Sequence, residues 1–166
     1  MPIPAMSGPC GLLPEGRHPC TMSEVEQLFV TRAPFTSERK LIFDALSVWL
    51  RAVGALFPGS KCWINGGFAT HKPWAAPADA DVVVFVTDAQ IDALTEQQQA
   101  QLDSLLTQHP PGGARIQPMG GLVDGFLSVR NEPGNTIYWL QQWARVRGAD
   151  GGEVHDVHKG FLEVVA

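Results

Sequence analysis

The chain has 166 residues, of which 45% are hydrophobic and 17% charged, and a net charge of −5 at pH 7. This length fits one domain with a sizeable core, and no apolar run approaches the roughly 20 residues that span a bilayer. The acidic balance gives no overall attraction for phosphate backbones, although it leaves room for a local basic patch. We therefore expect a globular protein without a membrane partner, and nucleic acid is disfavoured as its major partner.

Residues 1–20 are predicted to be an irregular N-terminal segment. They carry Pro and Gly where a signal peptide would have a basic end and a long apolar centre. The three cysteines, an odd number without metal-ligand spacing, suit a reducing compartment in which thiols stay free. Because no repeat or linker follows, we expect a single domain over residues 21–166 and a cytoplasmic location.

Two helices are predicted next along the chain. Thr21 and Glu24 form a capping-box pattern that starts a short helix over residues 22–30. After a Pro break, Thr36 or Ser37 can cap a longer helix in which apolar residues recur with helical spacing. The expected buried stripe of this longer helix is Leu41, Ala45, Val48, Trp49, Ala52 and Leu56.

Strand and helix signals alternate in the rest of the chain. Helical patterns cover residues 88–108, where Thr95 and Gln98 form a second capping box, and residues 135–146. Strand patterns cover residues 61–64, 81–86, 114–118, 121–129 and 160–165. The run Asp-Val-Val-Val-Phe-Val at 81–86 is apolar on both faces and is predicted to be central. This order predicts the α/β or α+β class, with a small mixed sheet flanked by helices.

Asp79 and Asp81 are the first candidates for chemistry. Two acids spaced two apart on a strand project from the same face of the sheet, where they repel each other and are costly to bury unpaired. A divalent cation between them turns that cost into affinity, and Mg²⁺ held by carboxylates is the usual arrangement. Gly66 and Gly67, at the end of the preceding strand, allow close backbone approach and amide contacts to a phosphate.

The spacing of these two pairs resembles the signature of the DNA polymerase beta-like nucleotidyltransferase superfamily. That signature is an apolar residue, Gly, Gly or Ser, a loop, and then Asp-apolar-Asp-apolar; here eleven residues separate Gly67 from Asp79. In detail the chain resembles a group of small bacterial and phage proteins with a minimal nucleotidyltransferase fold. They share a "LPEGRHPCT"-like start, a "W-I-[DN]-G-S-F-x-T-x-K" segment and a "KG-x-LEV"-like end, so the resemblance spans about residues 13–165.

The resemblance implies a nucleoside triphosphate as substrate and two Mg²⁺ ions held by three carboxylates. Gly66 and Gly67 would seat the triphosphate, and Asp79 and Asp81 would bind the metals. Asp124, which interrupts an apolar strand, is our candidate for the third carboxylate, and Glu163 in the last strand is a weaker one. The sequence departs from the pattern where Gly67 replaces the commoner Ser and where Asn65 replaces an acid found in some relatives.

Side chains near the Gly pair offer further candidates. Lys72 could neutralise a triphosphate or could be an ordinary solvated lysine, while His71 is expected to be incidental. Trp74, in the Pro-rich loop between the Gly pair and the acids, is the preferred nucleobase contact. Trp139 and Trp143 share one helix face and are expected to be core residues instead.

Three other groups are expected to be structural or solvated. His155 and His158, with Glu153 and Asp156, lack the further ligands that a zinc site needs. Lys159 precedes the last strand and is expected at the surface, with a phosphate contact left open. Arg39 and Lys40 start the long helix, and a solvated face is expected for both.

The sequence therefore supports two kinds of function. The first is Mg²⁺-dependent transfer of a nucleotidyl group from a nucleoside triphosphate to a hydroxyl on a protein or RNA acceptor. Small members of the superfamily often occur in toxin-antitoxin or phage-defence systems. The resemblance therefore implies such a setting for this chain. The second is a catalytically inactive scaffold or nucleotide-binding interaction module, because a fold and a partial motif do not establish turnover. An isolated Asp-x-Asp can also be a solvated strand start.

Overall fold

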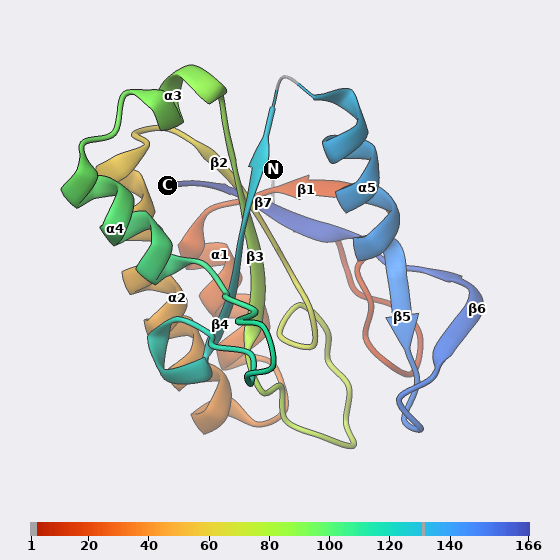
Figure 1. Cartoon of the computed structure of the whole chain (residues 1–166). Helices are drawn as coiled ribbons and strands as arrows, with labels where there is room; N and C mark the ends of the chain where they lie inside the picture. Colours follow the sequence, from red (N-terminus) through yellow and green to blue (C-terminus); the bar gives the residue numbers. More distant parts are fainter. Residues whose placement is uncertain (1–2, 131) are drawn as a thin grey trace.

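A computed structural model describes residues 3–130 and 132–166. Its centre is a five-stranded mixed sheet with the order β1-β7-β2-β3-β4 (Figure 1). β1 runs parallel to β7 and β3 parallel to β4, whereas β2 is antiparallel to both of its neighbours. The strands are β1 (Arg17–Pro19), β2 (Lys61–Asn65), β3 (Ala80–Val86), β4 (Val123–Val129) and β7 (Phe161–Val165).

Helices cover the sheet unequally on its two faces (Figure 1). One face packs on α1 (Met22–Glu26), a π-helical turn (Gln27–Thr31), α2 (Thr36–Leu56) and α4 (Glu96–Leu105), with α3 (Asp88–Asp92) at the sheet's end. The other face carries α5 (Pro133–Ala144) and the hairpin of β5 (Arg145–Arg147) and β6 (Glu153–His158). A 3-10 turn (Met119–Gly121) leads into β4. The expected α+β class with a small mixed sheet and flanking helices is confirmed.

The side chains of β3 point alternately to the two faces of the sheet and show how the packing on these faces differs. Val82, Val84 and Val86 point toward α2 and join the main core, whereas Val83 and Phe85 join a smaller aromatic cluster under α5. Both sets are buried, and β3 is hydrogen-bonded on both sides. The prediction of a central strand at 81–86 is therefore confirmed.

The long helix α2 forms as predicted, but its start and its buried face differ from the expectation. Neither Thr36 nor Ser37 caps it: the N-cap is Phe35, in a left-handed conformation with φ of 62° and no capping side chain. Of the predicted stripe, Trp49 is buried and Ala45, Ala52 and Leu56 pack partly buried against the core, but Leu41 and Val48 are exposed. The fully buried residues of the helix are Arg39, Ile42, Phe43, Leu46, Trp49, Leu50 and Val53. The helix has apolar residues on two adjacent faces, so periodicity alone could not choose between them.

The remaining boundaries follow the expectation with three exceptions. Both predicted capping boxes are present, and 88–108 is divided into α3 and α4. Residues 114–118 are not a strand, because only a single bridge joins Gln108 to Ile116 before Pro118 and the 3-10 turn. Residues 17–19 of the segment expected to be irregular form β1. The hairpin was not predicted: β5 begins at Arg145, inside the helix expected over residues 135–146, and β6 follows it. Among the described helices, none is both long and apolar enough to cross a bilayer.

Arg39 is buried completely and contradicts the prediction of a solvated face. Its guanidinium donates to four backbone carbonyls: Pro34 at 2.7 Å, Phe29 at 3.2 Å, Phe68 at 2.7 Å and Thr70 at 2.6 Å. These carbonyls belong to the π-helical turn, the chain that leads into α2, and the loop after β2. Arg39 therefore fastens the loop that follows the Gly pair to the helical layer.

Candidate active site

The strand register brings the predicted acids together at one end of the sheet. Asp81 on β3 pairs with Asp124 on β4, and on its other side it pairs with Asn65 on β2. All three side chains therefore lie in one row on the α5 face, and Asp79 immediately precedes β3. Asp81 and Asp124 are therefore neighbours across the sheet, and Asp79 lies two residues before Asp81.

An open pocket of about 520 Å³ contains this row and most of the other predicted residues. It lies between the ends of β2, β3 and β4 on one side and α5 with the β5–β6 hairpin on the other. Its charged lining is Lys72, Asp79, Asp81, Arg115, Asp124, Arg145, Arg147, Glu153 and Lys159. Five cations and four acids give this pocket a local balance of +1, in a chain whose net charge is −5. An anionic ligand is therefore attracted to the pocket rather than to the molecule as a whole.

Gly66 is required at its position by the acid that it faces. A Cβ atom there would lie 1.7 Å from Oδ2 of Asp81, and its φ of +78° is in the region that favours glycine. Gly67 is different, since a Cβ would meet only Pro77 at 3.6 Å and its φ is ordinary. A Ser at residue 67, as the resemblance expects, would therefore fit without strain.

Lys159 holds the Gly pair from the pocket side, which contradicts its expected surface position. Its side chain is buried, and Nζ donates to the Gly66 carbonyl at 3.1 Å. Burial lowers the pKa of Lys159 to about 8, although the nearby Asp81 opposes that shift. The segment from Gly66 to Thr70 is thus anchored by Lys159 on one side and by Arg39 on the other.

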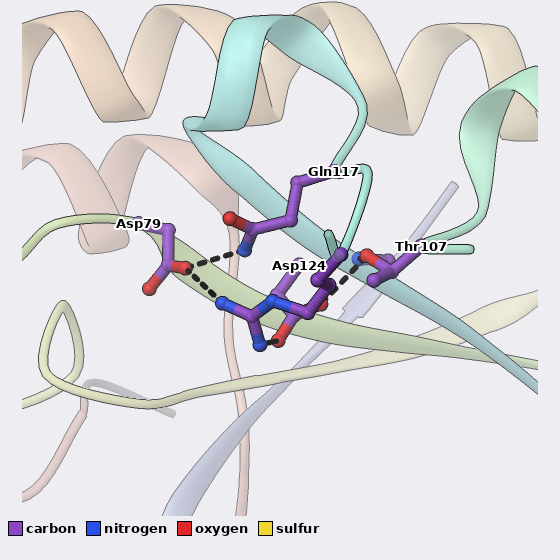
Figure 2. Close-up of polar contacts among 6 residues, drawn as sticks. Asp79, Thr107, Gln117 and Asp124 are labelled. Carbon is purple, nitrogen blue, oxygen red and sulfur yellow. Dashed lines mark hydrogen bonds and ion pairs between the residues drawn. The ribbon is translucent and has the colours of Figure 1, made fainter. Parts of the chain in front are cut away.

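Asp79 and Asp124 share one cation from the loop of residues 107–118, which we call the Arg115 loop. Arg115 Nη1 lies 2.9 Å from Oδ2 of Asp124, and Nη2 lies 3.8 Å from Oδ2 of Asp79. The same Asp79 oxygen accepts a bond from Gln117 at 2.6 Å, and Asp124 Oδ1 accepts one from Thr107 at 2.6 Å (Figure 2). Both carboxylates are therefore engaged by the Arg115 loop.

Among the described residues, no cation lies in direct contact with Asp81. Burial first, and then the charges of Asp79 and Asp124, raise the pKa of Asp81 to about 6, and Lys159 and Arg115 partly offset the rise. The neighbouring amide of Asn65 donates to the Trp143 carbonyl at 2.7 Å, while its buried Oδ1 has no hydrogen-bond partner within residues 3–130 and 132–166. The centre of the row is thus short of positive charge and of donors.

The chemistry of these groups fits a divalent cation of the Mg²⁺ type. Carboxylate and amide oxygens are its preferred ligands, and Arg115 already acts as a stand-in cation between two of them. Within residues 3–130 and 132–166, however, no three acids, histidines or cysteines converge into a ready ligand set. Asp79 and Asp124 are instead paired with the Arg115 guanidinium.

The two other predicted nucleotide contacts lie in different places. Lys72 lines the pocket, and its Nζ donates to the Arg147 carbonyl at 2.7 Å, which ties the loop to the hairpin. Trp74 is not part of the pocket lining; its exposed ring lies 6.0 Å from the Lys72 ammonium. The aromatic side chains that line the pocket are Phe126, Tyr138, Trp139 and Trp143.

Sequence reasoning missed several side chains of this site: Arg115, Tyr138, Arg145 and Arg147 in the pocket lining, and Gln117, which donates to Asp79. Arg115 and Gln117 lie in a segment expected to be a strand, and Tyr138 lies on a helix whose aromatics were expected in the core. Trp143 is indeed buried, but Tyr138 is 53% exposed. An arginine and a glutamine beside the Gly and Pro residues of 110–113 were a signal for a polar loop, although not for its contacts.

Glu163 is excluded as the third carboxylate by its contacts. It accepts bonds from Trp63 Nε1 at 2.9 Å, Arg17 at 3.1 Å and Lys61 at 3.2 Å, and it lines a separate pocket of about 150 Å³. His155 and His158 lie on β6, and both are exposed. Asp124 is therefore the third acid that the structure places beside Asp81.

Together the fold and the pocket define an α+β protein with a carboxylate row and a glycine turn at one end of a mixed sheet. The chain belongs to the DUF6932 family, which is described as a family of unknown function and whose sequence profile matches residues 4–165. No curated protein and no solved structure gives a significant match.

Proposed function

We propose that this protein is a Mg²⁺-dependent nucleotidyltransferase that moves a nucleotidyl group from a nucleoside triphosphate to a hydroxyl acceptor. The observation that carries the proposal is the row of Asp81 and Asp124, with Asp79 beside it and Gly66 directly beneath the Asp81 carboxylate. The cationic lining of the same pocket suits a triphosphate. The resemblance noted in the sequence points to the same chemistry.

Each part of the pocket has a role in this proposal. Asp79, Asp81 and Asp124 would hold Mg²⁺, which when bound neutralises phosphate charge and aligns the attacking and leaving oxygens. Gly66 and Gly67 leave the backbone open to a phosphate group. Lys72, Arg145 and Arg147 form the cationic wall on the side of the hairpin.

The aromatic wall of α5 supplies a place for the base. Tyr138 is half exposed toward solvent and lines the pocket with Trp139 and Gln142. An exposed aromatic face stacks on any base, and an amide can bond to a base edge. We assign the base to Tyr138 rather than to Trp74, because Trp74 is not part of the pocket lining.

The acceptor is proposed to be a protein side chain or an RNA end brought by a partner. The pocket opens between α5, the hairpin and the Arg115 loop, and this proposal uses its charged groups to bind the metal and the triphosphate, which leaves the acceptor to a partner. A toxin-antitoxin or phage-defence setting follows from the resemblance alone. Nucleotide binding without turnover is the second candidate, favoured by the engagement of Asp79 and Asp124 with Arg115.

Calorimetry with ATP, GTP, CTP and UTP, with and without Mg²⁺, tests the proposal together with an assay for pyrophosphate release. We expect Mg²⁺-dependent binding of at least one nucleotide, and transfer once an acceptor is supplied from RNA or protein fractions. Asp81→Asn should lower turnover by about a thousandfold or more, since it removes the central metal ligand. The matched control is Asp92→Asn, an exposed acid at the end of α3.

The outcomes separate the two candidates. Binding with no pyrophosphate release from any acceptor fraction would support the nucleotide-binding module. If none of the four nucleotides binds, both candidates are wrong. Equal turnover by Asp81→Asn and Asp92→Asn would show that the activity belongs to another site.

A further inference from the structure

Arg115 lies where three acids face one pocket. Its guanidinium joins Asp79 to Asp124, whereas no cation of the described residues contacts the neighbouring Asp81. The Arg115 side chain is itself 46% exposed, so a movement into the pocket needs no unpacking of the core. An exposed ion pair of this kind contributes little stability and is easily exchanged.

The two ends of the Arg115 loop are held differently. Arg115 donates to Asp124, Gln117 to Asp79 and Thr107 to Asp124, so three side chains of the loop contact two carboxylates. Further bonds hold the Thr107 end to the fold: Thr107 exchanges two bonds with the Gly125 backbone, and the Gln108 amide donates to the Asp103 carbonyl. Gln108 also pairs with Ile116 within the loop. Releasing the two carboxylates therefore frees the segment from Arg115 to Gln117 first.

A guanidinium and a divalent cation compete for the same oxygens. A guanidinium brings one positive charge to these acids, while a divalent cation brings two and contacts the oxygens directly. We propose that Arg115 is an internal counter-ion of the carboxylate row, which must leave Asp79 and Asp124 before a divalent cation binds and then faces the anionic ligand in the same pocket. This inference rests on the proposed function, because it names how that function's metal site is filled.

The proposal makes two opposite predictions for one substitution. Removing Arg115 removes the competitor, so Arg115→Ala should bind Mn²⁺ alone about tenfold more tightly than the unmodified chain. The same variant lacks a cation for the phosphates, so it should bind the Mn²⁺ complex of a non-hydrolysable nucleoside triphosphate about three- to tenfold more weakly. A merely structural arginine would weaken both.

Electron paramagnetic resonance of free Mn²⁺ measures the first effect, and calorimetry measures the second. Arg130→Ala is the matched control, since Arg130 directly follows β4 and lines the separate pocket at the opposite end of the sheet. Circular dichroism checks folding, and Arg115→Gln replaces the Ala variant if that variant unfolds. Amide exchange over residues 107–118 should quicken when Mn²⁺ is added to the unmodified chain and should be fast from the start in Arg115→Ala.

Each result has a distinct meaning. Tighter Mn²⁺ binding by Arg115→Ala than by both the unmodified chain and Arg130→Ala supports the counter-ion role. Equal binding by all three overturns that role and leaves the proposed function standing. Absence of Mn²⁺ binding in every variant overturns the metal site, and with it both the counter-ion role and the proposed function.

Discussion

Two carboxylate centres lie on the same face of the sheet, and they are built differently. Glu163 on β7 is surrounded by donors: one indole N–H and two cations contact its two oxygens. Asp79 and Asp124 share the one arginine Arg115, and Asp81 has no ion-pair partner among the residues that the structure describes. The aromatic residues Trp63 and Phe161 separate the two centres.

The difference distinguishes a structural charge from a functional one. A buried charge whose hydrogen-bonding capacity is filled is stable where it lies and has nothing left to offer a ligand. A group of acids with too few partners lowers the stability of the fold, and a cation bound from solution can offset that loss. Arg39, with four carbonyl acceptors, belongs with Glu163 in the first class.

The largest effect is expected where a saturated charge is removed. Arg39→Met should lower the free energy of unfolding by about 4 kcal/mol or more, because four backbone carbonyls lose their donor in the interior. That is a large part of the roughly 5–15 kcal/mol that stabilises a typical domain. Urea denaturation followed by circular dichroism measures it. Lys40→Met, the exposed neighbour, should change stability by no more than about 0.5 kcal/mol.

A smaller loss is expected at the saturated carboxylate. Glu163→Gln keeps the shape and one acceptor for Trp63 but removes the negative charge that faces Arg17 and Lys61. We expect a loss of about 2 kcal/mol in the same denaturation experiment, since both cations are half exposed and can be solvated. Mn²⁺ affinity should stay unchanged. A variant that kept full stability and lost Mn²⁺ binding would instead make Glu163 a ligand.

Removing the charge of Asp81, which lacks an ion-pair partner among the described residues, should raise the free energy of unfolding instead of lowering it. The pKa of Asp81 is raised from its ordinary value of 3.8 to about 6, so the native state binds this proton more tightly than the unfolded chain does. Between pH 4 and 6 the native state therefore holds more protons, and the free energy of unfolding falls as pH rises. Above pH 6 the full cost of the buried charge is present.

Asp81→Asn should accordingly be more stable than the unmodified chain at pH 7.5 by about 1–2 kcal/mol. The gain should shrink as pH falls and vanish near pH 4, where both chains are neutral at this position. Denaturation at several pH values measures the difference, with Asp92→Asn as an exposed control that should show no such trend. A gain that did not depend on pH would mean that packing, not charge, causes it.

The sequence predicted the acids of this site better than their surroundings. Asp79, Asp81, Asp124 and the Gly pair were found because strand periodicity and a local motif place them, and both depend on neighbours in the chain. The register that sets Asp81 beside Asp124 joins strands 43 residues apart, so the pairing itself was only an expectation.

The contacts of long polar side chains could not be predicted in the same way. Arg39, Arg115 and Lys159 reach partners 5 to 93 residues away in sequence, through loops whose course no local pattern specifies. The expected surface positions of Arg39 and Lys159 follow from composition, which favours the surface for Lys and Arg. The buried face of α2 was misassigned at Leu41 and Val48 for a related reason, because packing against the sheet selects the face.

The smallest expected effect is on nucleotide affinity, and it distinguishes Tyr138 from Trp74 as the residue that contacts the base. Tyr138 lines the pocket, whereas Trp74, which the sequence favoured, is not part of its lining. Stacking on one aromatic ring is worth about 1–3 kcal/mol, and less when the ring is half exposed. Tyr138→Ala should therefore weaken nucleotide binding by about fivefold, and Trp74→Ala should leave it unchanged.

Calorimetry with the best-bound nucleotide and Mg²⁺ measures both affinities. Ile137→Ala is the matched control, since Ile137 is as exposed as its neighbour Tyr138 but is not part of the pocket lining. If Trp74→Ala weakens binding and Tyr138→Ala does not, the base lies over the Pro-rich loop and α5 has another role. If all three variants bind alike, the carboxylate row and the glycine turn hold the nucleotide by its phosphates alone.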